Sequence, residues 1–279
     1  MSFLISVDEL KTKMDASDEM VIVDTRFELT NPGAGRAAYL KGHIPQAFYL
    51  DLNKDLAGEK TEHGGNHPLP DINEFAQKIG NIGIDQHTTV IVYDQGNEMF
   101  SGRCWWLLHY LGHESVYVLD GGLERWQEKG YEITTKQPVA ERKTFIPKPR
   151  ADEVVDIHQV KEKLQEDSAI LIDSRSKDRY LGKNEPLYKK AGHIPGAINY
   201  FYKDVLSEDG RWKDPDDLSQ HFASLPKDKE IMVSCGSGVS ATPNIMALKM
   251  AGFHNVKLYP GSFSDWISYD ENEVETEDE

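Results

Sequence analysis

Short apolar runs recur along the chain, and longer stretches with helical spacing of apolar and polar positions lie between them. The runs predict strands at 21–24, 90–93, 116–119, 170–173, 231–233 and 256–259. They are continuously apolar and rich in β-branched residues, which is typical of strands buried on both faces of a parallel sheet. Helical patterns lie at 101–111, 157–165 and 240–251. This alternation predicts an α/β fold, with a mainly parallel sheet and helices on both of its faces.

The whole pattern occurs twice. VIVDTR at 21–26 matches ILIDSR at 170–175, the GHIP motif at 42–45 returns at 192–195, and 111–126 matches 251–266. The offset between the copies is 150 at the GHIP motifs but only 140 at the last match, so the first copy holds about ten extra residues between them. A duplication of this kind predicts two similar domains.

We place these domains at 1–140 and 151–270. The stretch 136–150 is rich in proline and charge, shows little periodicity and is therefore expected to be a linker. Residues 271–279 are expected to form a solvated, disordered tail, because the last nine residues hold six acids and no base.

Composition excludes several classes of protein. The chain has 279 residues, 47 Asp and Glu against 31 Lys and Arg, a formal net charge of −16 and two cysteines. Two cysteines exclude a disulfide scaffold and a four-cysteine zinc site, and we expect neither a metal nor a cofactor. The acidic balance argues against binding nucleic acid or an anionic membrane. No apolar run approaches the roughly 20 residues that span a bilayer, and the N-terminus lacks the pattern of an export signal, so we expect a cytoplasmic protein.

A cysteine, Cys235, directly follows the central predicted strand of the second copy and stands just before a helix. Ligand sites in open α/β sheets lie at such strand ends. Glycines let the loop backbone curl so that its N–H groups point inward, and the positive end of the next helix points at the same place. These effects lower a cysteine pKa from its usual value of about 8.5, so we predict a nucleophile. The predicted anion-binding loop comprises Gly236, Ser237, Gly238, Val239 and Ser240.

The first copy differs at this position, where it has Asp94 in place of the cysteine. The other cysteine, Cys104, lies in the apolar helical stretch RCWWLLHY and is expected to serve packing. A phosphatase of the same architecture would need an arginine six positions after the cysteine, where this chain has Ala241.

The duplicated halves, the two GHIP motifs, GNEMFSGRCWW at 96–106 and CGSGVSA at 235–241 together resemble the tandem-domain rhodanese-type sulfurtransferases. The resemblance spans nearly the whole chain. The CGSGVSA loop is most similar to that of the mercaptopyruvate sulfurtransferases, whereas thiosulfate-preferring rhodaneses typically place Arg and Lys there. The resemblance implies a non-catalytic first domain, a catalytic second domain and a persulfide on Cys235.

The expected reaction therefore moves a sulfur from a small-molecule donor through Cys235 to cyanide, thioredoxin or a small thiol. A neutral loop favours mercaptopyruvate, which carries one carboxylate, over thiosulfate, whose two charges call for nearby cations. Thiosulfate as the main donor stays an alternative, as does a non-enzymatic persulfide carrier.

Arg179 has no basic counterpart in the first copy, and the resemblance implies that an arginine at this position grips the anionic end of the donor. Arg175 is matched by Arg26 in the other copy, so we expect it to support the fold. Mercaptopyruvate sulfurtransferases often have a second arginine further on, where this chain offers only Lys189 or Lys190, and a lysine cannot reproduce the bidentate geometry with which an arginine binds a carboxylate.

Among the histidines, His193 is expected to be structural, because the GHIP motif also occurs in the copy without the cysteine. The resemblance implies that a first-domain histidine faces the loop serine and forms a proton relay with it. We assign these parts to His43 and Ser237, without a secure third member. His67, in GGNHPLP, is expected to be an ordinary loop residue.

Overall fold

The structure is a computed structural model that describes residues 3–277, and the chain divides into two compact units. Unit 1 consists of the residues up to 58 together with 70–150 and 208–212, and unit 2 consists of 59–69, 151–207 and the residues from 213 onward. The sequence predicted two uninterrupted domains. In the structure each unit instead includes a short segment from the other half of the chain.

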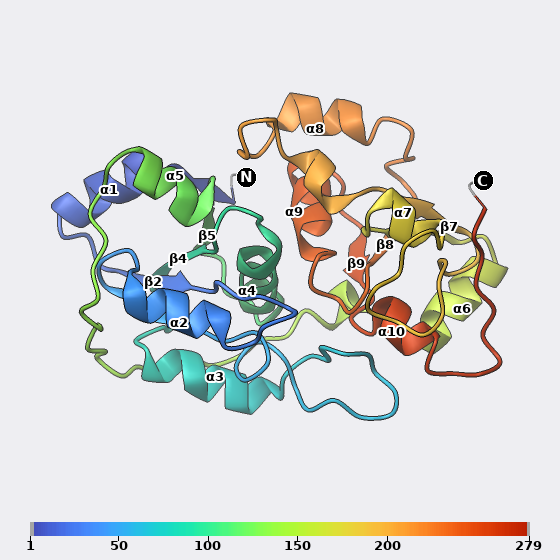
Figure 1. Cartoon of the computed structure of the whole chain (residues 1–279), viewed down its shortest axis with the longest axis horizontal. Coiled ribbons are helices and arrows are strands. Elements are labelled where there is room, and N and C mark those ends of the chain that lie inside the picture. Colours follow the sequence, from blue (N-terminus) through green and yellow to red (C-terminus); the bar gives the residue numbers. More distant parts are fainter. Residues whose placement is uncertain (1–2, 278–279) are drawn as a thin grey trace. The chain divides into compact units, whose positions relative to one another are not determined.

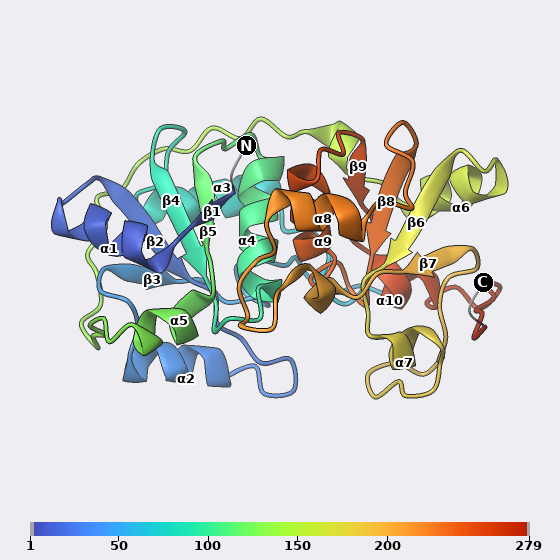
Figure 2. The same ribbon diagram turned by 90° about the horizontal axis from the view of Figure 1, so that it is seen from above.

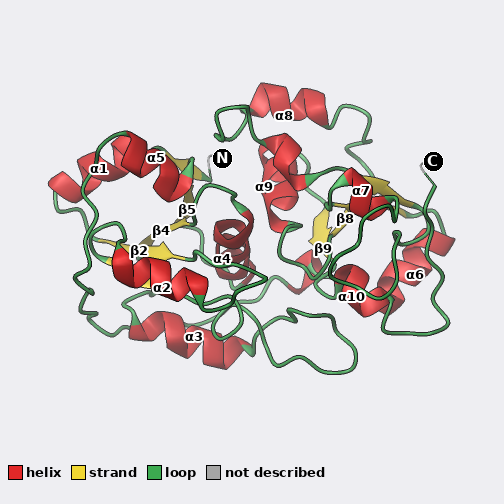
Figure 3. Cartoon of the chain, in the orientation of Figure 1, coloured by secondary structure: helices red, strands yellow, loops and turns green. Residues whose placement is uncertain are grey.

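Helices and strands alternate along the chain (Figures 1 and 3). The strands are β1 (Leu4–Ile5), β2 (Met20–Asp24), β3 (Ala47–Tyr49), β4 (Thr89–Tyr93), β5 (Val116–Leu119), β6 (Ala169–Asp173), β7 (Ala197–Asn199), β8 (Glu230–Ser234) and β9 (Val256–Leu258). The helices of unit 1 are α1 (Val7–Asp15), α2 (Ala34–Lys41), α3 (Ile72–Asn81), α4 (Met99–Tyr110) and α5 (Gly122–Glu128). Those of unit 2 are α6 (Ile157–Gln165), α7 (Lys177–Tyr180), α8 (Pro215–His221), α9 (Thr242–Met250) and α10 (Ser262–Trp266), with short 3-10 helices at Ala151–Glu153 and Tyr202–Val205.

Unit 1 is built on a parallel sheet with the strand order β1-β5-β4-β2-β3. Apolar side chains of α1 and α5, among them Leu10 and Trp126, pack on one face against Ile22 and Ile91. Helices α3 and α4 lie on the opposite face (Figure 1). The sheet therefore has helices on both faces, which is why its central strands are apolar without alternation.

Unit 2 repeats this design with a parallel sheet in the order β7-β6-β8-β9. Helices α6 and α10 pack on one face through residues such as Val160 and Phe263, which contact Leu171 and Met232. Helices α8 and α9 lie on the other face (Figure 2). The predicted α/β class, with two similar domains and helices on both faces of each sheet, is confirmed.

The six predicted strands all occur, and the predicted limits of 116–119 and 157–165 coincide with β5 and α6. The pattern missed β1, β3 and β7, which have only two or three residues each and lie at sheet edges. None of the helices among residues 3–277 is both long and apolar enough to cross a membrane.

A buried arginine–aspartate pair recurs beside the GHIP motif of each unit. Arg26 donates through Nε and Nη2 to Asp24, and Arg175 donates in the same way to Asp173. Each Nη2 also donates to the carbonyl of its GHIP glycine, at 2.7 and 2.8 Å. The side chain of Arg175 is fully buried in this network, as a role in the fold requires.

The C-terminal segment differs from the expected disordered tail over residues 271–277. Its backbone pairs with unit 2, where His193 and Glu275 exchange N–H to carbonyl bonds of 2.8 and 3.0 Å. The indole of Trp266 also donates to a carbonyl of the segment at 2.8 Å. Backbone groups make these contacts, so the acidic composition does not prevent the segment from packing. Residues 278–279 of the expected tail lie outside the described residues.

Candidate active site

Cys235 lies directly after β8, at the carboxyl end of an inner strand of the unit 2 sheet. Its N–H donates to Ser262 Oγ at 3.1 Å, and its carbonyl accepts from the N–H of Phe263 at 3.0 Å. The residue is only 1% exposed. The loop after it leads into α9, whose first turn contains Pro243 and whose positive end begins there. The thiol therefore has the strand–loop–helix setting of an anion site.

The two loop glycines have different roles. Gly238 has a φ of +75°, a conformation that favours glycine, and a Cβ there would lie 2.4 Å from the carbonyl oxygen of Pro260. Gly236 is not left-handed, but a Cβ on it would lie 2.5 Å from the hydroxyl oxygen of Tyr188. We expected both glycines to let the loop backbone curl, and only Gly238 has a backbone conformation that requires glycine for this. Gly236 makes room for a tyrosine.

The other loop residues are held close to the start of α9. The carbonyl of Val239 accepts from both the N–H and the hydroxyl of Thr242, at 3.1 and 2.8 Å. Val239 is 3% exposed and Ser237 is 8% exposed, while Ser240 is partly buried. The loop between Cys235 and α9 is therefore compact and largely buried.

Ser237 forms a hydrogen bond with a histidine that the sequence did not single out. The distance from Ser237 Oγ to His67 Nδ1 is 2.7 Å, although the two residues are 170 positions apart. A hydroxyl bonded to an imidazole is a common arrangement for moving a proton. Ser237 and His67 are therefore the candidate relay pair.

His67 reaches the loop because residues 59–69, which we call the arm, belong to unit 2. The N–H of Gly64 donates to Asp265 Oδ1 at 2.7 Å, and the N–H of Asn66 donates to Ser264 Oγ at 3.0 Å. The ring of His63 stacks on Tyr269 with 4.0 Å between centroids. These contacts attach the arm to α10 and the residues after it, and so fix the position of His67.

The contacts of His43 argue against its assignment as the relay histidine. His43 is fully buried in unit 1, where its Nδ1 lies 2.7 Å from the carbonyl oxygen of Tyr39 and its Nε2 lies 3.2 Å from that of Lys136. Its ring also stacks on Tyr39. His193 repeats two of these contacts in unit 2, where its Nδ1 lies 2.8 Å from the carbonyl oxygen of Tyr180 and its ring stacks on that of Tyr180. Both GHIP histidines therefore support the fold.

The sequence contained one signal that favoured His67. It lies between the GHIP motif and Gly112, the interval in which the first copy has about ten extra residues, whereas both GHIP histidines are repeated. A residue present in only one copy is a better candidate for a function found in only one copy.

Arg179 lies near the loop and forms a salt bridge with a glutamate. Its Nε and Nη2 each donate to the carboxylate of Glu185 at 3.0 Å. Glu185 also accepts from Arg175 at 3.2 Å. The guanidinium carbon of Arg179 lies 5.3 Å from the centroid of the Tyr188 ring, and its side chain is 20% exposed. Arg179 thus lies beside Tyr188, which contacts the loop at Gly236, and Glu185 balances part of its charge.

Lys190, one of the two lysines that could take the place of a second arginine, contacts backbone carbonyls of the C-terminal segment. Lys190 Nζ lies 3.2 Å from the carbonyl oxygen of Asn272 and 3.4 Å from that of Asp270. The residue near Lys190 in the sequence that contacts the loop is Tyr188, through Gly236. Sequence reasoning missed Tyr188 because it looked for a positive charge.

In unit 1, Asp94 follows β4 as Cys235 follows β8, and it shows that such a loop holds an anion. Its carboxylate accepts from five backbone N–H groups at 2.9 to 3.2 Å. The donors are Gly96, Asn97, Glu98, Phe100 and Ser101. Hydrogen bonds from N–H groups to a carboxylate are charge-assisted and strong.

Replacing Asp94 with alanine is therefore expected to lower the free energy of unfolding by about 3 kcal/mol or more, because buried donors lose their acceptor. The matched variant Asp94→Asn, which keeps one acceptor oxygen, is expected to lose less. Urea unfolding followed by tryptophan fluorescence measures both midpoints. An Asp94→Ala midpoint equal to that of the native protein would show that the carboxylate contributes nothing to the loop.

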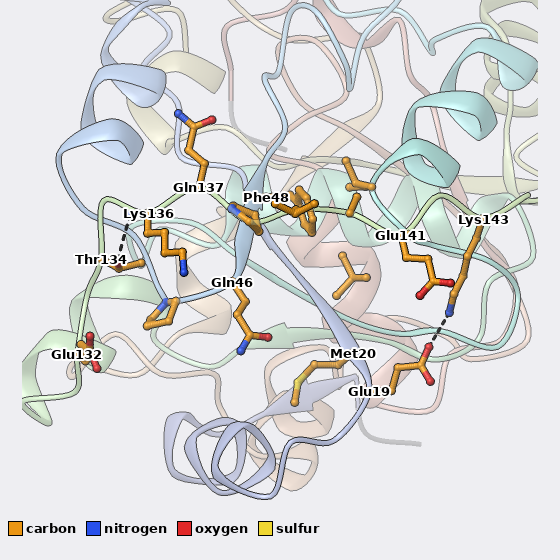
Figure 4. Close-up of a pocket in the computed structure, with 17 residues that line it drawn as sticks. Glu19, Met20, Gln46, Phe48, Glu132, Thr134, Lys136, Gln137, Glu141 and Lys143 are labelled. Atoms are coloured by element: carbon orange, nitrogen blue, oxygen red, sulfur yellow. Dashed lines mark hydrogen bonds and ion pairs between the residues drawn. The ribbon is translucent and has the colours of Figure 1, made fainter.

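A hollow of about 690 Å³ in unit 1 is lined by none of the predicted site residues (Figure 4). Residues of β2, β3 and the linker line it, with a 2.7 Å ion pair between Lys143 and Glu19. None of its lining residues is a cysteine, histidine or serine. Across residues 3–277, no group of three or more His, Cys, Asp or Glu side chains is placed to hold a metal.

Comparison with known proteins decides the family. The rhodanese-like domain family matches this chain twice, over residues 6–129 and 156–269. The chain belongs to the rhodanese family. Its two matched regions correspond to the two copies found in the sequence, so the resemblance to tandem-domain rhodaneses is confirmed.

This rhodanese-family chain has relatives that match most of its length. It is 37% identical to a probable 3-mercaptopyruvate sulfurtransferase of Pseudomonas aeruginosa, over 99% of this chain and 98% of that protein. It is 32% identical to the thiosulfate sulfurtransferase of the mouse, over 88% and 84% of the two chains. The crystal structure of SseA from Escherichia coli, described as a 3-mercaptopyruvate sulfotransferase, matches with a TM-score of 0.81 and 32% identity, over 95% and 100% of the chains. The expectation of a sulfurtransferase enzyme is confirmed.

Proposed function

We propose that this enzyme takes sulfur from 3-mercaptopyruvate, holds it as a persulfide on Cys235 and passes it to a thiol or to cyanide. The observation that carries the proposal is the 2.7 Å bond between Ser237 and His67 beside the Cys235 loop. A nucleophile with a relay pair next to it suits a donor whose leaving group must gain a proton.

In the first step the Cys235 thiolate attacks the sulfur of mercaptopyruvate. A sulfur–sulfur bond forms, the carbon–sulfur bond breaks, and its electron pair goes to the enolate of pyruvate. That enolate gains a proton through Ser237 and His67 and leaves as pyruvate. The outer sulfur stays as a persulfide anion, which the loop amides and the start of α9 favour, as five amides favour the carboxylate of Asp94.

In the second step an acceptor thiolate attacks the outer sulfur. The sulfur–sulfur bond breaks, and its electron pair returns to Cys235 as a thiolate. A thiol acceptor, such as thioredoxin or a small thiol, leaves as a persulfide, whereas cyanide leaves as thiocyanate. We assign the reaction to the cytoplasm, since both cysteines are free thiols and a reducing compartment keeps them so.

The charge around Cys235 favours mercaptopyruvate over thiosulfate. Arg175 and Arg179 are balanced by Asp173 and Glu185, so the arginines bring no excess positive charge. A monoanion is easier to bind there than a dianion, because removing charge from water is costly without cations. The names of the relatives include both donors, so the donor needs a direct test.

For the native enzyme, kcat/KM with cyanide as acceptor is expected to be at least about tenfold higher for mercaptopyruvate than for thiosulfate, a difference of about 1.4 kcal/mol in transition-state binding. Steady-state assays of pyruvate and thiocyanate measure the two values. A higher value for thiosulfate would overturn the donor assignment. Sulfur on Cys235 that no acceptor removes would identify a carrier instead.

A further inference from the structure

Helix α10 is bonded through its first turn to the loop that begins at Cys235. The N–H groups of Phe263 and Ser264 donate to the carbonyls of Cys235 and Gly236, at 3.0 and 2.9 Å. The N–H of Cys235 in turn donates to Ser262 Oγ at 3.1 Å. Because these bonds join the helix to the loop, a segment attached to the helix has a defined position relative to Cys235.

The arm, residues 59–69, lies beside the same helix and is bound by two of its side chains (Figure 1). Asp265 Oδ1 accepts from the N–H of Gly64 at 2.7 Å. Ser264 Oγ accepts from the N–H of Asn66 at 3.0 Å. Helix α10 therefore binds the loop mainly through backbone groups and the arm through side chains, so a side-chain substitution can release the arm while the loop stays in place.

Asp265 is also bonded on its other carboxylate oxygen. Its Oδ2 accepts from the hydroxyl of Tyr259 at 2.7 Å, and Asp265 is only 5% exposed. Burial, followed by the charge of Asp265, raises the pKa of Tyr259 above its usual value, so the hydroxyl stays protonated and remains a donor. With Oδ2 bonded to Tyr259, Oδ1 is directed at the N–H of Gly64. A bond from an N–H group to a carboxylate is charge-assisted and strong.

Gly65 brings the backbone of the arm against the start of α10. Its φ is +85°, a conformation that favours glycine, and a Cβ there would lie 2.4 Å from the carbonyl oxygen of Gly261 and 3.0 Å from Ser264 Oγ. Gly65 stands between Gly64 and Asn66, whose N–H groups are both bound to the helix. A side chain at this position would therefore push the arm away from α10.

We propose that Asp265 is a positioning residue, which binds the arm at Gly64 and thereby keeps His67 within hydrogen-bond distance of Ser237. His67 follows closely after Gly64 in the sequence, and its Nδ1 lies 2.7 Å from Ser237 Oγ. A small displacement of the arm therefore separates the relay pair. This inference rests on the proposed function and names the group that maintains its relay.

The effect depends on the donor, because only one of the two leaving groups needs a proton. Mercaptopyruvate leaves as an enolate, which must gain a proton to become pyruvate. With thiosulfate, the Cys235 thiolate attacks the outer sulfur, the sulfur–sulfur bond breaks, and its electron pair leaves with sulfite without a proton transfer. A displaced His67 therefore slows the reaction of mercaptopyruvate and leaves that of thiosulfate nearly unchanged.

The first test replaces Asp265 with alanine. The kcat with mercaptopyruvate is expected to fall about tenfold or more, with its KM changed by less than about threefold, because positioning acts on proton transfer and not on binding. The kcat/KM for thiosulfate is expected to change by less than about threefold. Asp265→Asn keeps an acceptor oxygen for Gly64 and is expected to restore kcat to within about threefold of the native value. Equal losses for both donors would show that Asp265 supports the Cys235 loop itself, and would overturn the proposal.

Hydrogen exchange measures the attachment of the arm directly and without a donor. In Asp265→Ala the amides of residues 59–69 are expected to exchange about tenfold faster than in the native enzyme, because losing a hydrogen bond to a charged group favours local opening. The amides of residues 235–241 are expected to exchange at the native rate. Native exchange of the arm in Asp265→Ala would overturn the proposal.

Asp214→Ala is the matched control for both measurements. Its carboxylate also accepts backbone N–H groups in unit 2, those of Asp216 and Asp217 at 3.0 and 2.9 Å, but it lies at the start of α8. The variant is expected to lose stability through its lost helix cap while the arm exchange and the kcat stay native. Faster arm exchange in this control as well would attribute the effect to general loss of stability and contradict the role of Asp265.

A second variant reaches the same contact from the arm. Asp265→Ala also takes the acceptor from the buried Tyr259 hydroxyl, whereas Gly65→Ala leaves that bond in place. Gly65→Ala is expected to show the same faster exchange of the arm and the same loss of kcat restricted to mercaptopyruvate. Melting temperatures show whether each variant folds. A native kcat with mercaptopyruvate in folded Gly65→Ala would contradict the proposal.

A double variant separates this proposal from the proposed function. If Asp265 acts through His67, adding Asp265→Ala to His67→Asn is expected to lower kcat by less than about twofold more. A further loss of about tenfold would show that Asp265 acts elsewhere. A normal kcat in His67→Asn overturns the proposed relay, and a native preference for thiosulfate overturns the proposed donor. In either case the exchange of the arm still decides whether Asp265 positions it.

Discussion

Replacing Cys235 with serine is expected to abolish sulfur transfer, lowering kcat/KM by about 10⁴-fold or more for either donor. A serine hydroxyl is not ionised near neutral pH and does not carry sulfane sulfur, so the persulfide cannot form. Intact-mass measurement after incubation with donor is expected to show one added sulfur on the native enzyme and none on the variant. Retained turnover in Cys235→Ser would rule out the mechanism.

Cys104 supplies the matched control. It is fully buried in α4, and burial, followed by Asp55, raises the pKa of its thiol. Cys104→Ala is expected to keep full persulfide formation and to cost about 1 kcal/mol of stability through the small cavity it leaves. Loss of the added sulfur in Cys104→Ala would show that Cys104 takes part in the chemistry.

Replacing His67 with asparagine is expected to lower kcat with mercaptopyruvate about 100-fold, since a positioned acid–base group typically contributes that much or more. The melting temperature is expected to change little, because His67 is only partly buried and the arm is attached through other residues. His43→Asn is the matched control. It removes a buried ring that stacks on Tyr39, so it is expected to lower the melting temperature while the folded fraction keeps its kcat.

A double variant tests whether Ser237 and His67 act together as one proton relay. If the two residues act as one relay, Ser237→Ala combined with His67→Asn is expected to reduce kcat no more than the stronger single variant. If the reduction of kcat in the double variant equals the product of the two single reductions, Ser237 and His67 act independently. A normal kcat in His67→Asn together with a low kcat in folded His43→Asn would instead support His43 as the relay histidine.

Much of the fold could be predicted because it depends on local patterns. Runs such as VIVD and ILID identify buried strands, and comparing the two copies identifies the repeat. Comparison also led to the prediction of Cys235 as the nucleophile, because only one of two equivalent loops has a thiol. The edge strands β1, β3 and β7 were missed, since two or three residues are too few to form a pattern.

The rest of the site depends on contacts between distant parts of the chain. His43 was chosen because it belongs to a recognisable motif, yet the structure uses that motif to hold the fold of both units. Glu185 and Tyr188 lie in an irregular stretch, where no periodicity shows which side chains turn toward the loop. The role of Gly236 became clear only once Tyr188 was placed beside it.

By itself the sequence determined the duplicated α/β fold and predicted Cys235 and its loop as the site of a nucleophile, because each follows from residues adjacent in the chain or from one copy compared with the other. Only the tertiary structure decided which groups surround that nucleophile. His67 meets Ser237 across 170 positions because the arm joins unit 2, and Tyr188 covers Gly236 because Phe263 holds its ring. Such pairings arise from packing and hydrogen bonds between separate segments, which local spacing does not encode.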